Sequence, residues 1–336
     1  QERNYIMFNK AVGIDLGTAN VLIYVKGQGV VLDEPAVVSI DAHTKKPLAV
    51  GRDAKTMLGR TPGRIHAIRP LKDGVIADFE VTEIMLQYFM KELKLKGIFS
   101  RPDVLICCPS NITSVERKAI SDAAYRTGAK RVFIEEEPKV AAIGAKLDIS
   151  KPSGNMVLDI GGGTTDVAIL SLGDIVTSTS LKIAGDTLDS DIIKYVKDTY
   201  KLLIGDSTAE KIKTTIGTAF MESGSEDLTI DVSGRDLVTG LPSTITLKAS
   251  ETQVAMNESL QDIVRACRSV LEQTPPELSA DIIVRGIVLT GGGALLRGLD
   301  RLISESLNTP VYVAENALTC VAEGTGIMLE NLEYLG

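Results

Sequence analysis

Short apolar segments alternate with longer amphipathic segments along the whole chain. The short segments have the length and composition of buried β-strands, and they are residues 11–14, 21–25, 30–32, 36–40, 104–107, 157–159, 167–170 and 283–289. The longer segments have apolar residues at helical spacing, and they are residues 82–93, 114–127, 188–203, 207–220, 253–273 and 295–307. This alternation predicts an α/β protein.

Two apolar hairpins of similar sequence lie about half the chain apart. Residues 11–25 read AVGIDLGTANVLIYV, and residues 155–170 read NMVLDIGGGTTDVAIL. In each, an apolar strand ends in an aspartate (Asp15 or Asp159), and a Gly/Thr turn leads into a second apolar strand. Single glycine turns recur by chance because glycine serves tight turns everywhere. Two turns with the same order of residues favour a duplication into two facing lobes.

The two turns have the chemistry of a phosphate site. Backbone N–H groups without neighbouring Cβ atoms approach an anion closely, and Thr18, Thr164 and Thr165 add hydroxyl donors. Asp15 and Asp159 stand where carboxylates hold a magnesium ion that keeps several of its waters. The alternative for each aspartate is a structural role as the cap of a turn.

A third glycine cluster, Gly291, Gly292 and Gly293, follows the predicted strand 283–289. We expect it to open a helix, and to pack against adenine or present the helix N-terminus to an anion. Two better-known nucleotide motifs are absent from the sequence. Neither glycine cluster completes G-x-G-x-x-G, and no G-x-x-x-x-G-K-[ST] occurs, so a dinucleotide fingerprint and a P-loop are excluded.

Composition narrows the class of protein. The 336 residues suffice for roughly two domains, and 44% hydrophobic with 24% charged residues is typical of a globular protein. A net charge of −8 argues against nucleic acid as a partner. The four cysteines form no CxxC pair, so we expect neither a zinc site nor disulfide bonds. This use of cysteine is typical of a protein in the reducing cytoplasm. No signal peptide or membrane span is predicted, and we expect residues 1–6 to be a cloning remnant before Met7.

The glycine motifs resemble those of the superfamily of actin, sugar-kinase and heat-shock-chaperone ATPases. GIDLGTAN (13–20) and DIGGGTTDVAI (159–169) are similar to its two phosphate motifs, and LTGGG (289–293) to its adenosine motif. Further segments resemble the MreB family of bacterial actins: IRPLKDGVIADFE (68–80), EEPKVAAIGA (136–145), IAGDTLD (183–189), IGDSTAEKIK (204–213) and VTGLP (238–242). The resemblance spans residues 11–330.

The resemblance implies an actin-like ATPase fold of two duplicated lobes, in four subdomains, around a nucleotide cleft. After residues 1–10, the expected subdomains are IA (11–32, 71–145 and 320–336), IB (33–70), IIA (146–186 and 251–319) and IIB (187–250). It also implies ATP and Mg²⁺ as cofactors, slow hydrolysis coupled to assembly, and filaments of paired protofilaments.

The resemblance assigns roles to individual residues. Asp15 and Asp159 hold Mg²⁺ through water, and the phosphates are lined by Gly17, Thr18, Ala19, Asn20, Gly161, Gly162, Gly163 and Thr164. Glu137, helped by Thr164, polarises the attacking water, which suits a carboxylate beside a γ-phosphate; the alternative is a solvated acid at a helix start before Pro138.

The remaining assignments concern the nucleoside. Glu210 and Lys213 match contacts to ribose and adenine, and Gly291, Gly292 and Gly293 match the adenosine motif. Glu210 has an alternative role, because Ser207-Thr208-Ala209-Glu210 reads as a capping box. Gly185 and Asp186 are expected at the start of a helix opposite the base.

The family works at the inner face of the cell membrane, from the cytoplasmic side. Ile98 and Phe99 form an apolar tip with basic neighbours, which suits insertion into an anionic leaflet; the alternative is that both side chains join the core. Membrane or wall-related partner proteins are also implied. Lys139 and Glu323 depart from the family, which usually has an apolar residue and a lysine at these positions.

Two other functions fit the same fold. A small-molecule kinase is the stronger alternative, and it needs a base aspartate beside the γ-phosphate where this chain has Glu137. A chaperone ATPase is the other, and it is expected to carry a substrate-binding domain after its ATPase domain. The sequence therefore predicts a filament-forming ATPase for cell shape or cytoskeletal organisation.

Overall fold

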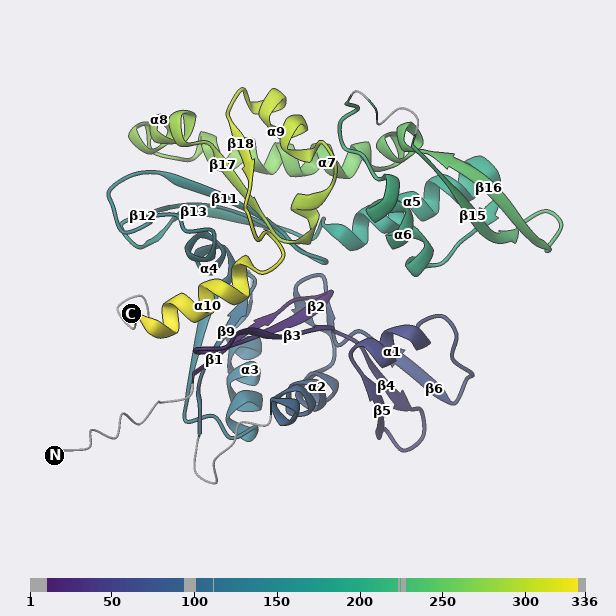
Figure 1. Ribbon diagram of the computed structural model, residues 1–336, viewed down its shortest axis with the longest axis horizontal. Helices are drawn as coiled ribbons and strands as arrows, with labels where there is room; N and C mark the ends of the chain where they lie inside the picture. Colours follow the sequence, from purple (N-terminus) through teal and green to yellow (C-terminus); the bar gives the residue numbers. More distant parts are fainter. Residues whose placement is uncertain (1–10, 94–100, 111, 223, 225–227, 332–336) are drawn as a thin grey trace. The chain divides into compact units, whose positions relative to one another are not determined.

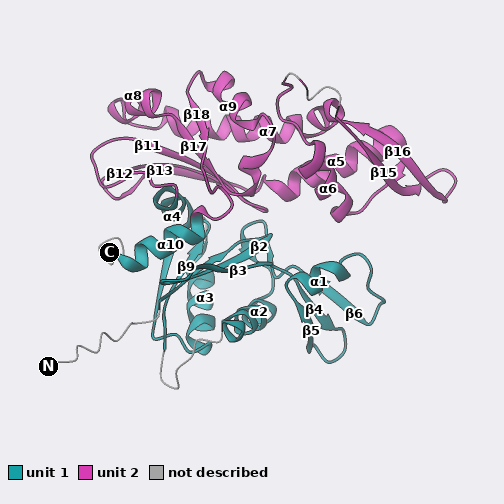
Figure 2. Ribbon diagram, in the orientation of Figure 1, with its two compact units in different colours: residues 1–144, 321–336 teal, residues 145–320 magenta. Residues whose placement is uncertain are grey.

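The chain folds into two compact units. The computed structural model describes residues 11–93, 101–110, 112–222, 224 and 228–331. One unit comprises residues 1–144 with 321–336, and the other comprises residues 145–320, as Figure 2 shows. The further division of each unit into two subdomains stays a prediction.

The first unit is built on a five-stranded sheet in the order β10-β9-β1-β2-β3. Its strands are β1 Ala11–Leu16, β2 Asn20–Val25, β3 Gly29–Pro35, β9 Asp103–Cys108 and β10 Arg131–Glu136. Strands β1, β2 and β3 pair antiparallel, whereas β9 runs parallel to both β1 and β10. Every residue of β1 and β9 is buried, which explains their continuous apolar sequences.

The second unit repeats this design in the order β13-β12-β11-β17-β18. Its strands are β11 Asn155–Ile160, β12 Thr165–Ser171, β13 Asp174–Leu181, β17 Ile287–Thr290 and β18 Val311–Val313. Again a three-stranded antiparallel meander continues into two parallel strands. The predicted α/β class and the duplication of a hairpin into two lobes are therefore confirmed.

Helices and small sheets complete the first unit (Figure 1). The helices are α1 Arg52–Met57, α2 Phe79–Glu92, α3 Ser114–Arg126, α4 Glu137–Gly144 and α10 Cys320–Glu330. The small strands are β4 Val38–Asp41, β5 Pro47–Val50, β6 Ile65–Ile68, β7 Leu71–Lys72 and β8 Val75–Ile76. Helix α2 starts at its N-cap Asp78, which accepts a hydrogen bond from Val81 N, and it buries Met85 and Phe89 in the core.

The second unit has its own helices and core. Its helices are α5 Gly185–Tyr200, α6 Asp206–Ile216, α7 Ala249–Glu272, α8 Pro276–Arg285 and α9 Leu299–Leu307. A separate sheet, β14-β15-β16, comprises Leu202–Leu203, Thr229–Asp236 and Pro242–Lys248. Helix α7 places Met256, Leu260 and Ile263 at helical spacing in the core beneath the main sheet.

Several predicted elements differ in their bounds from the structure, and at two of them a glycine with positive φ is the cause. The apolar run 283–289 was expected to be one strand, but α8 continues to Arg285 and β17 begins at Ile287. Gly286, with φ of 82°, separates them, since a left-handed residue ends the helix. The predicted helix 295–307 begins only at Leu299, because Gly298 adopts a φ of 72° at its N-cap. Short apolar runs do not distinguish helix from strand by periodicity.

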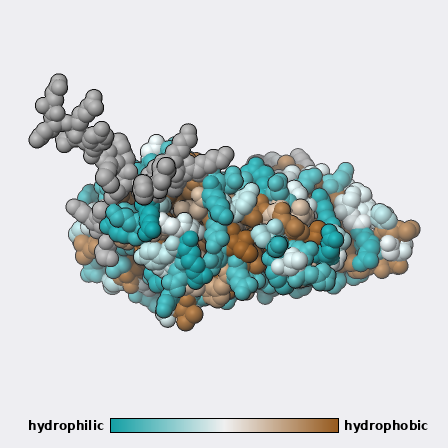
Figure 3. Space-filling model, turned by 90° about the horizontal axis from the view of Figure 1, so that it is seen from below, coloured by the Kyte–Doolittle hydropathy of each residue, from teal (hydrophilic) through white to brown (hydrophobic). Residues whose placement is uncertain are grey.

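The cysteine side chains lie inside the protein, and its surface carries both polar and apolar residues. All four cysteines are free and buried. Hydrophilic and hydrophobic residues are interspersed on the face in Figure 3. Among the described residues, no helix has the length and apolar character needed to cross a membrane. The predicted membrane tip, Ile98 and Phe99, lies outside the described residues.

Candidate functional site

The first predicted phosphate turn connects β1 to β2. Asp15 lies in β1 and is 9% exposed, and Gly17 follows at the start of the turn. A Cβ on Gly17 would lie 2.7 Å from the carbonyl oxygen of Asn20, so this turn accepts only glycine there. The geometry gives the physical reason for the sequence Asp-x-Gly.

The other residues of this turn have different surroundings. The buried Thr18 hydroxyl accepts a hydrogen bond of 3.4 Å from Gly74 N, and Ala19 is exposed. The side-chain amide of Asn20 donates to Asp33 Oδ1 at 2.9 Å. Asn20 therefore braces the turn against β3 in this structure, and its predicted contact with phosphate stays a prediction.

Glu137 and Asp15 lie beside the same pair of thiols. Glu137 opens α4 directly after β10, and Asp15 pairs with Cys107 across the parallel strands β1 and β9. Burial is the main cause that raises the pKa of Cys107, and the charges of Asp15 and Glu137 raise it further. Burial also raises the pKa of Cys108 to about 12, again with both carboxylates contributing. The predicted metal residue and the predicted catalytic residue of this unit thus lie at the same edge of the sheet.

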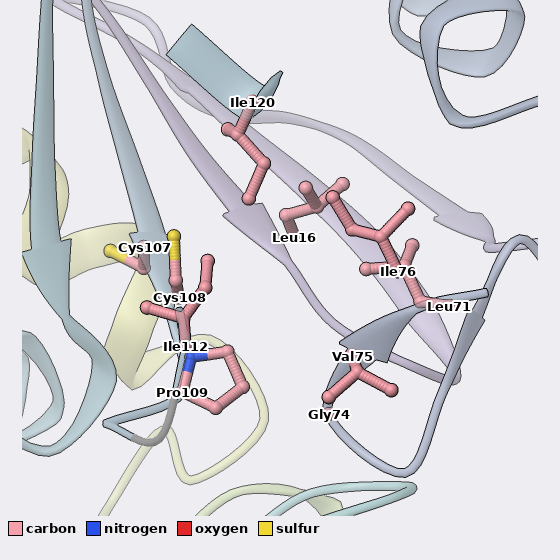
Figure 4. Close-up of a pocket in the computed structure, with 10 residues that line it drawn as sticks. All are labelled: Leu16, Leu71, Gly74, Val75, Ile76, Cys107, Cys108, Pro109, Ile112 and Ile120. Carbon is pink, nitrogen blue, oxygen red and sulfur yellow. The ribbon is translucent and has the colours of Figure 1, made fainter. Parts of the chain in front are cut away.

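An apolar pocket adjoins this turn at the carboxyl ends of β1 and β9 (Figure 4). Its lining residues are Leu16, Leu71, Gly74, Val75, Ile76, Cys107, Cys108, Pro109, Ile112 and Ile120. In Figure 4 the β7–β8 hairpin faces the cysteines of β9 across the pocket. The ends of parallel strands in open α/β sheets are where ligands commonly bind.

In the second unit, Asp159 occupies the corresponding place at the end of β11. It is 2% exposed and pairs with Thr290 of the parallel strand β17. The Thr290 hydroxyl donates to Asp159 Oδ1 at 2.5 Å. One carboxylate oxygen is thereby held by the neighbouring strand, which fixes the orientation of the side chain.

The second phosphate turn, residues 161–164, contacts the start of α5. Gly161 N donates to Thr164 O at 2.9 Å and closes the turn. The first two amides of α5 then donate back to the turn, Gly185 N to Gly161 O at 3.1 Å and Asp186 N to Gly162 O at 2.8 Å. The structure thus brings the predicted residues Gly185 and Asp186 to the phosphate turn itself.

Helix α6 places Lys213 against α5. Its ammonium group lies 2.9 Å from Asp189 Oδ2 and donates to Gly185 O at 2.7 Å. Burial raises the pKa of Asp189 to about 6; the charge of Lys213 lowers it, whereas those of Asp186 and Glu210 raise it. These four side chains therefore form one charged cluster between α5 and α6.

The alternative role of Glu210 as part of a capping box is wrong. Helix α6 begins at Asp206, and its N-cap is Gly205, which has no side chain to accept a cap hydrogen bond. Ser207 is already inside the first turn of the helix. The local pattern matched a cap because Asp, Ser and Thr are all favourable helix-start residues, so sequence alone does not fix which one begins the helix.

The third glycine cluster packs against β11. Gly291 has a φ of 80°, and a Cβ there would lie 2.4 Å from the carbonyl oxygen of Ile160. A Cβ on Gly293 would lie 2.2 Å from Ile160 Cγ2. The expected helix is here a four-residue 3-10 turn, Gly292–Leu295. Glycines let this turn lie directly beside β11, the strand that contains Asp159.

Sequence reasoning missed two side chains of the site, Thr290 and Asp189. Both stand inside motifs shared with the family, Thr290 in LTGGG and Asp189 in IAGDTLD. Asp189 is one helical turn after Asp186, so both carboxylates lie on the same face of α5. That spacing was the available signal.

Lys139, one of the two departures from the family, is paired with Glu135 at 3.5 Å, and both side chains are mostly buried.

Each unit offers one buried carboxylate of the kind that holds magnesium through water. Within the described part of the chain, no group of three or more His, Cys, Asp or Glu side chains is arranged to hold a metal directly. Magnesium usually keeps several waters and takes one or two carboxylates together with the phosphates of its nucleotide. Asp15 and Asp159, each beside a glycine turn, supply carboxylates of this kind.

Comparison with known sequences gives one consistent family. A family model described as "MreB/Mbl protein" matches residues 9–336. The cell shape-determining protein Mbl of Bacillus cereus is 63% identical over 329 residues, which cover 98% of each chain. The cell shape-determining protein MreB of Escherichia coli K12 is 54% identical over 336 residues, which cover 98% of this chain and 96% of that protein.

Comparison with solved structures agrees. MreB5 of Spiroplasma citri bound to ADP superposes with a TM-score of 0.93 at 40% identity, covering 97% of this chain and 98% of that chain. Its complex with AMPPNP gives 0.92 at 41% identity, covering 97% of both. A subunit of the MamK double helical filament shares the fold, with a TM-score of 0.82 at 20% identity over 96% and 99% of the chains.

Proposed function

This chain belongs to the MreB/Mbl family, and on that premise we propose that it is a bacterial actin homologue that binds ATP and forms filaments for cell shape. The relatives named above are cell shape-determining proteins, and the related MreB5 binds ADP and AMPPNP. The sequence similarity to these relatives extends over 98% of this chain, so it includes both units.

One observation carries the proposal: each unit has a buried aspartate at the end of the first strand of a hairpin, followed by a glycine turn. Asp15 with its turn and Asp159 with its turn are repeated on two sheets of the same strand order. Turns rich in glycine present N–H groups to phosphate oxygens. We assign both turns to the phosphates of one ATP, and both aspartates to the waters of its Mg²⁺.

The chain's residues have distinct tasks in this proposal. The phosphates are lined in one unit by Gly17, Thr18, Ala19 and Asn20, and in the other by Gly161, Gly162, Gly163 and Thr164. Bound Mg²⁺ supplies positive charge against the phosphate oxygens. Glu137 accepts a hydrogen bond from a water molecule and orients it toward the γ-phosphate, and Thr164 assists.

The nucleoside is assigned to the second unit. Glu210 and Lys213 of α6 bind the ribose and adenine, and Gly291, Gly292 and Gly293 let the base approach the backbone. The positions of Lys213 beside Gly185, and of Gly291 beside Ile160, support this assignment because both adjoin the phosphate turn or the strand before it. ATP hydrolysis is slow and coupled to assembly in paired protofilaments.

We further propose that the filaments work in the cytoplasm at the inner face of the cell membrane, with membrane or wall-related proteins as partners. The apolar tip Ile98 and Phe99, with Lys91, Lys94, Lys96 and Arg101 nearby in sequence, supports this. Apolar residues enter the acyl boundary while basic residues are attracted to anionic headgroups. Family membership does not favour the small-molecule kinase alternative.

The decisive experiment is electron microscopy of the purified protein with Mg²⁺ and ATP, with a nucleotide-free sample beside it. We expect filaments only with nucleotide. Asp159→Asn removes a predicted metal carboxylate and should abolish them, whereas Asp174→Asn changes an exposed aspartate at the start of β13 and should not. Monomers that bind ATP yet remain dispersed, both alone and with anionic vesicles, would overturn the filament function.

A further inference from the structure

Lys213 joins the two helices that lie beside the second phosphate turn. From α6 its ammonium reaches the first turn of α5, where it contacts Asp189 Oδ2 at 2.9 Å and the carbonyl oxygen of Gly185 at 2.7 Å. An ammonium group has three N–H donors. Two of the three N–H groups of Lys213 thus point at Asp189 and Gly185, and these two contacts fix the direction of the third N–H group.

Gly185 links this contact to the phosphate turn. Its N–H donates to Gly161 O, and its carbonyl accepts from Lys213. A Cβ at Gly185 would lie 3.3 Å from Gly161 O and 3.3 Å from Lys213 Nζ, so the three groups are packed in contact. A continuous path of contacts therefore runs from α6 through Gly185 to the turn of residues 161–164.

The buried carboxylate of Asp189 lowers the stability of the folded state more than an apolar contact between the two helices would. Its side chain is 12% exposed, and Oδ1 is buried without a hydrogen-bond partner among the described residues. A buried carboxylate with one unsatisfied oxygen destabilises the folded state, and a well-packed apolar pair does the same structural task at lower cost. Such a group, in a charged cluster with Asp186 and Glu210, is typical of a functional site.

We propose that Asp189 is a positioning residue for the nucleotide. It holds Lys213 against the first turn of α5 and so sets the distance between the nucleoside-binding face of α6 and the phosphate turn. A ligand that carries both a nucleoside and phosphates spans both parts and depends on Asp189. A ligand with phosphates alone contacts only the turn and does not. This inference rests on the proposed function of the site.

The test measures binding of Mg·ADP and of magnesium pyrophosphate to the full chain by calorimetry. We expect Asp189→Asn to weaken ADP binding by about tenfold, the size of one charge-assisted hydrogen bond, and to change pyrophosphate binding less than twofold. Asp191→Asn is the matched control. It lies on the same helix and is half-buried, but it accepts from Ser259 Oγ on α7 at 2.6 Å, away from α6.

A double-mutant cycle with Lys213→Met tests whether Asp189 acts through Lys213. Lys213→Met removes a proposed nucleoside contact together with the ion pair, so it should lose more ADP affinity than Asp189→Asn. The double variant should lose no more than Lys213→Met alone, because Asp189 acts only through Lys213. Thermal melting without ligand establishes that each variant is folded; if Asp189→Asn does not fold, Lys213→Met alone must show the selective loss of ADP affinity.

Three results would overturn the inference: additive losses in the cycle, equal losses for ADP and pyrophosphate, or equal effects of Asp189→Asn and Asp191→Asn. Failure of the proposed function is a separate result. In that case the unaltered protein binds neither ADP nor pyrophosphate, whatever residue stands at position 189.

Discussion

The hydroxyl of Thr290 donates a 2.5 Å hydrogen bond to Oδ1 of Asp159, and Thr290 has no exposed surface. In the first unit the corresponding neighbour of Asp15 is Cys107, because both pairs join the first strand of the hairpin to the next parallel strand. A thiol is a weak donor, and burial together with nearby carboxylates raises its pKa, so it stays protonated. The duplicated lobes therefore place different side chains beside their two aspartates.

Replacing Thr290 should weaken magnesium-dependent nucleotide binding. Thr290→Val keeps the shape of the side chain but removes the donor to Asp159, a hydrogen bond to a charged group worth about 1.5–3 kcal/mol. We expect ADP affinity with Mg²⁺ to fall about tenfold or more, and affinity in EDTA to change little. Titration calorimetry in both buffers measures the difference.

Two controls accompany this prediction. Thr290→Ser retains the hydroxyl and should restore affinity. Thr274→Val removes another buried hydroxyl, one that donates to Val270 O at 2.6 Å in α7, far along the chain from the glycine turns. An equal loss in Thr274→Val would mean that Thr290 has no special role.

Glu137 should be needed for hydrolysis and not for binding. Glu137→Gln keeps the size of the side chain but removes the negative charge that orients water, and groups in this role contribute about 100-fold or more to rate. Phosphate release should fall by that order while ATP affinity is unchanged. Glu136→Gln, one residue earlier at the end of β10, is the matched control. Undiminished release from Glu137→Gln would refute the assignment.

The charge of Asp189 should make stability depend on pH. Its pKa is about 6 in the folded protein, above the usual 3.8, so the folded state holds its proton more tightly than the unfolded state. The stabilising contribution is complete below about pH 4 and is lost as the pH rises through 6. Compared with Asp189→Asn, the protein should lose about 2–3 kcal/mol of unfolding free energy across that range. Urea unfolding at pH 4.5 and pH 7 measures it, and a parallel pH dependence in both proteins would contradict it.

Gly324 permits close packing of α10 on α4. A Cβ there would lie 2.1 Å from the backbone oxygen of Val140, which cannot move aside as a side chain would. Gly324→Ala should therefore lower the free energy of unfolding by about 1–3 kcal/mol. Gly63→Ala is the control, because its Cβ would meet nothing within 4 Å. Similar urea midpoints for the two variants would show that α10 adjusts without cost.

Membrane binding should depend on the sequence tip. Ile98→Ser with Phe99→Ser removes apolar groups expected to enter the acyl boundary, so co-sedimentation with anionic liposomes should fall several-fold. Val238→Ser with Leu241→Ser is a useful control, since these two apolar residues at the β15–β16 connection are 82% and 64% exposed. Unchanged co-sedimentation of the first variant would remove the tip from consideration; an equal fall in both would indicate non-specific apolar adhesion.

The sequence by itself determined the α/β class, the two hairpins and the aspartates that end their first strands. These features are local, because an apolar strand, an acidic residue and a glycine turn follow one another within a few residues. The pattern of residue types along the chain therefore suffices to predict them. The sequence therefore predicted the turn at Gly17, and the repeated spacing of Asp15 and Asp159 indicated the duplication.

The tertiary structure alone decided which side chains hold these groups in place. Thr290 lies beside Asp159 because β17 pairs with β11 in parallel after a connection of more than a hundred residues. Lys213 reaches Asp189 and Gly185 because α6 packs on α5. Local propensity carries no information about such pairings, since they depend on how separate elements bury their apolar faces together. The boundary between α8 and β17 likewise depends on the positive φ of Gly286, which the apolar pattern of residues 283–289 does not indicate.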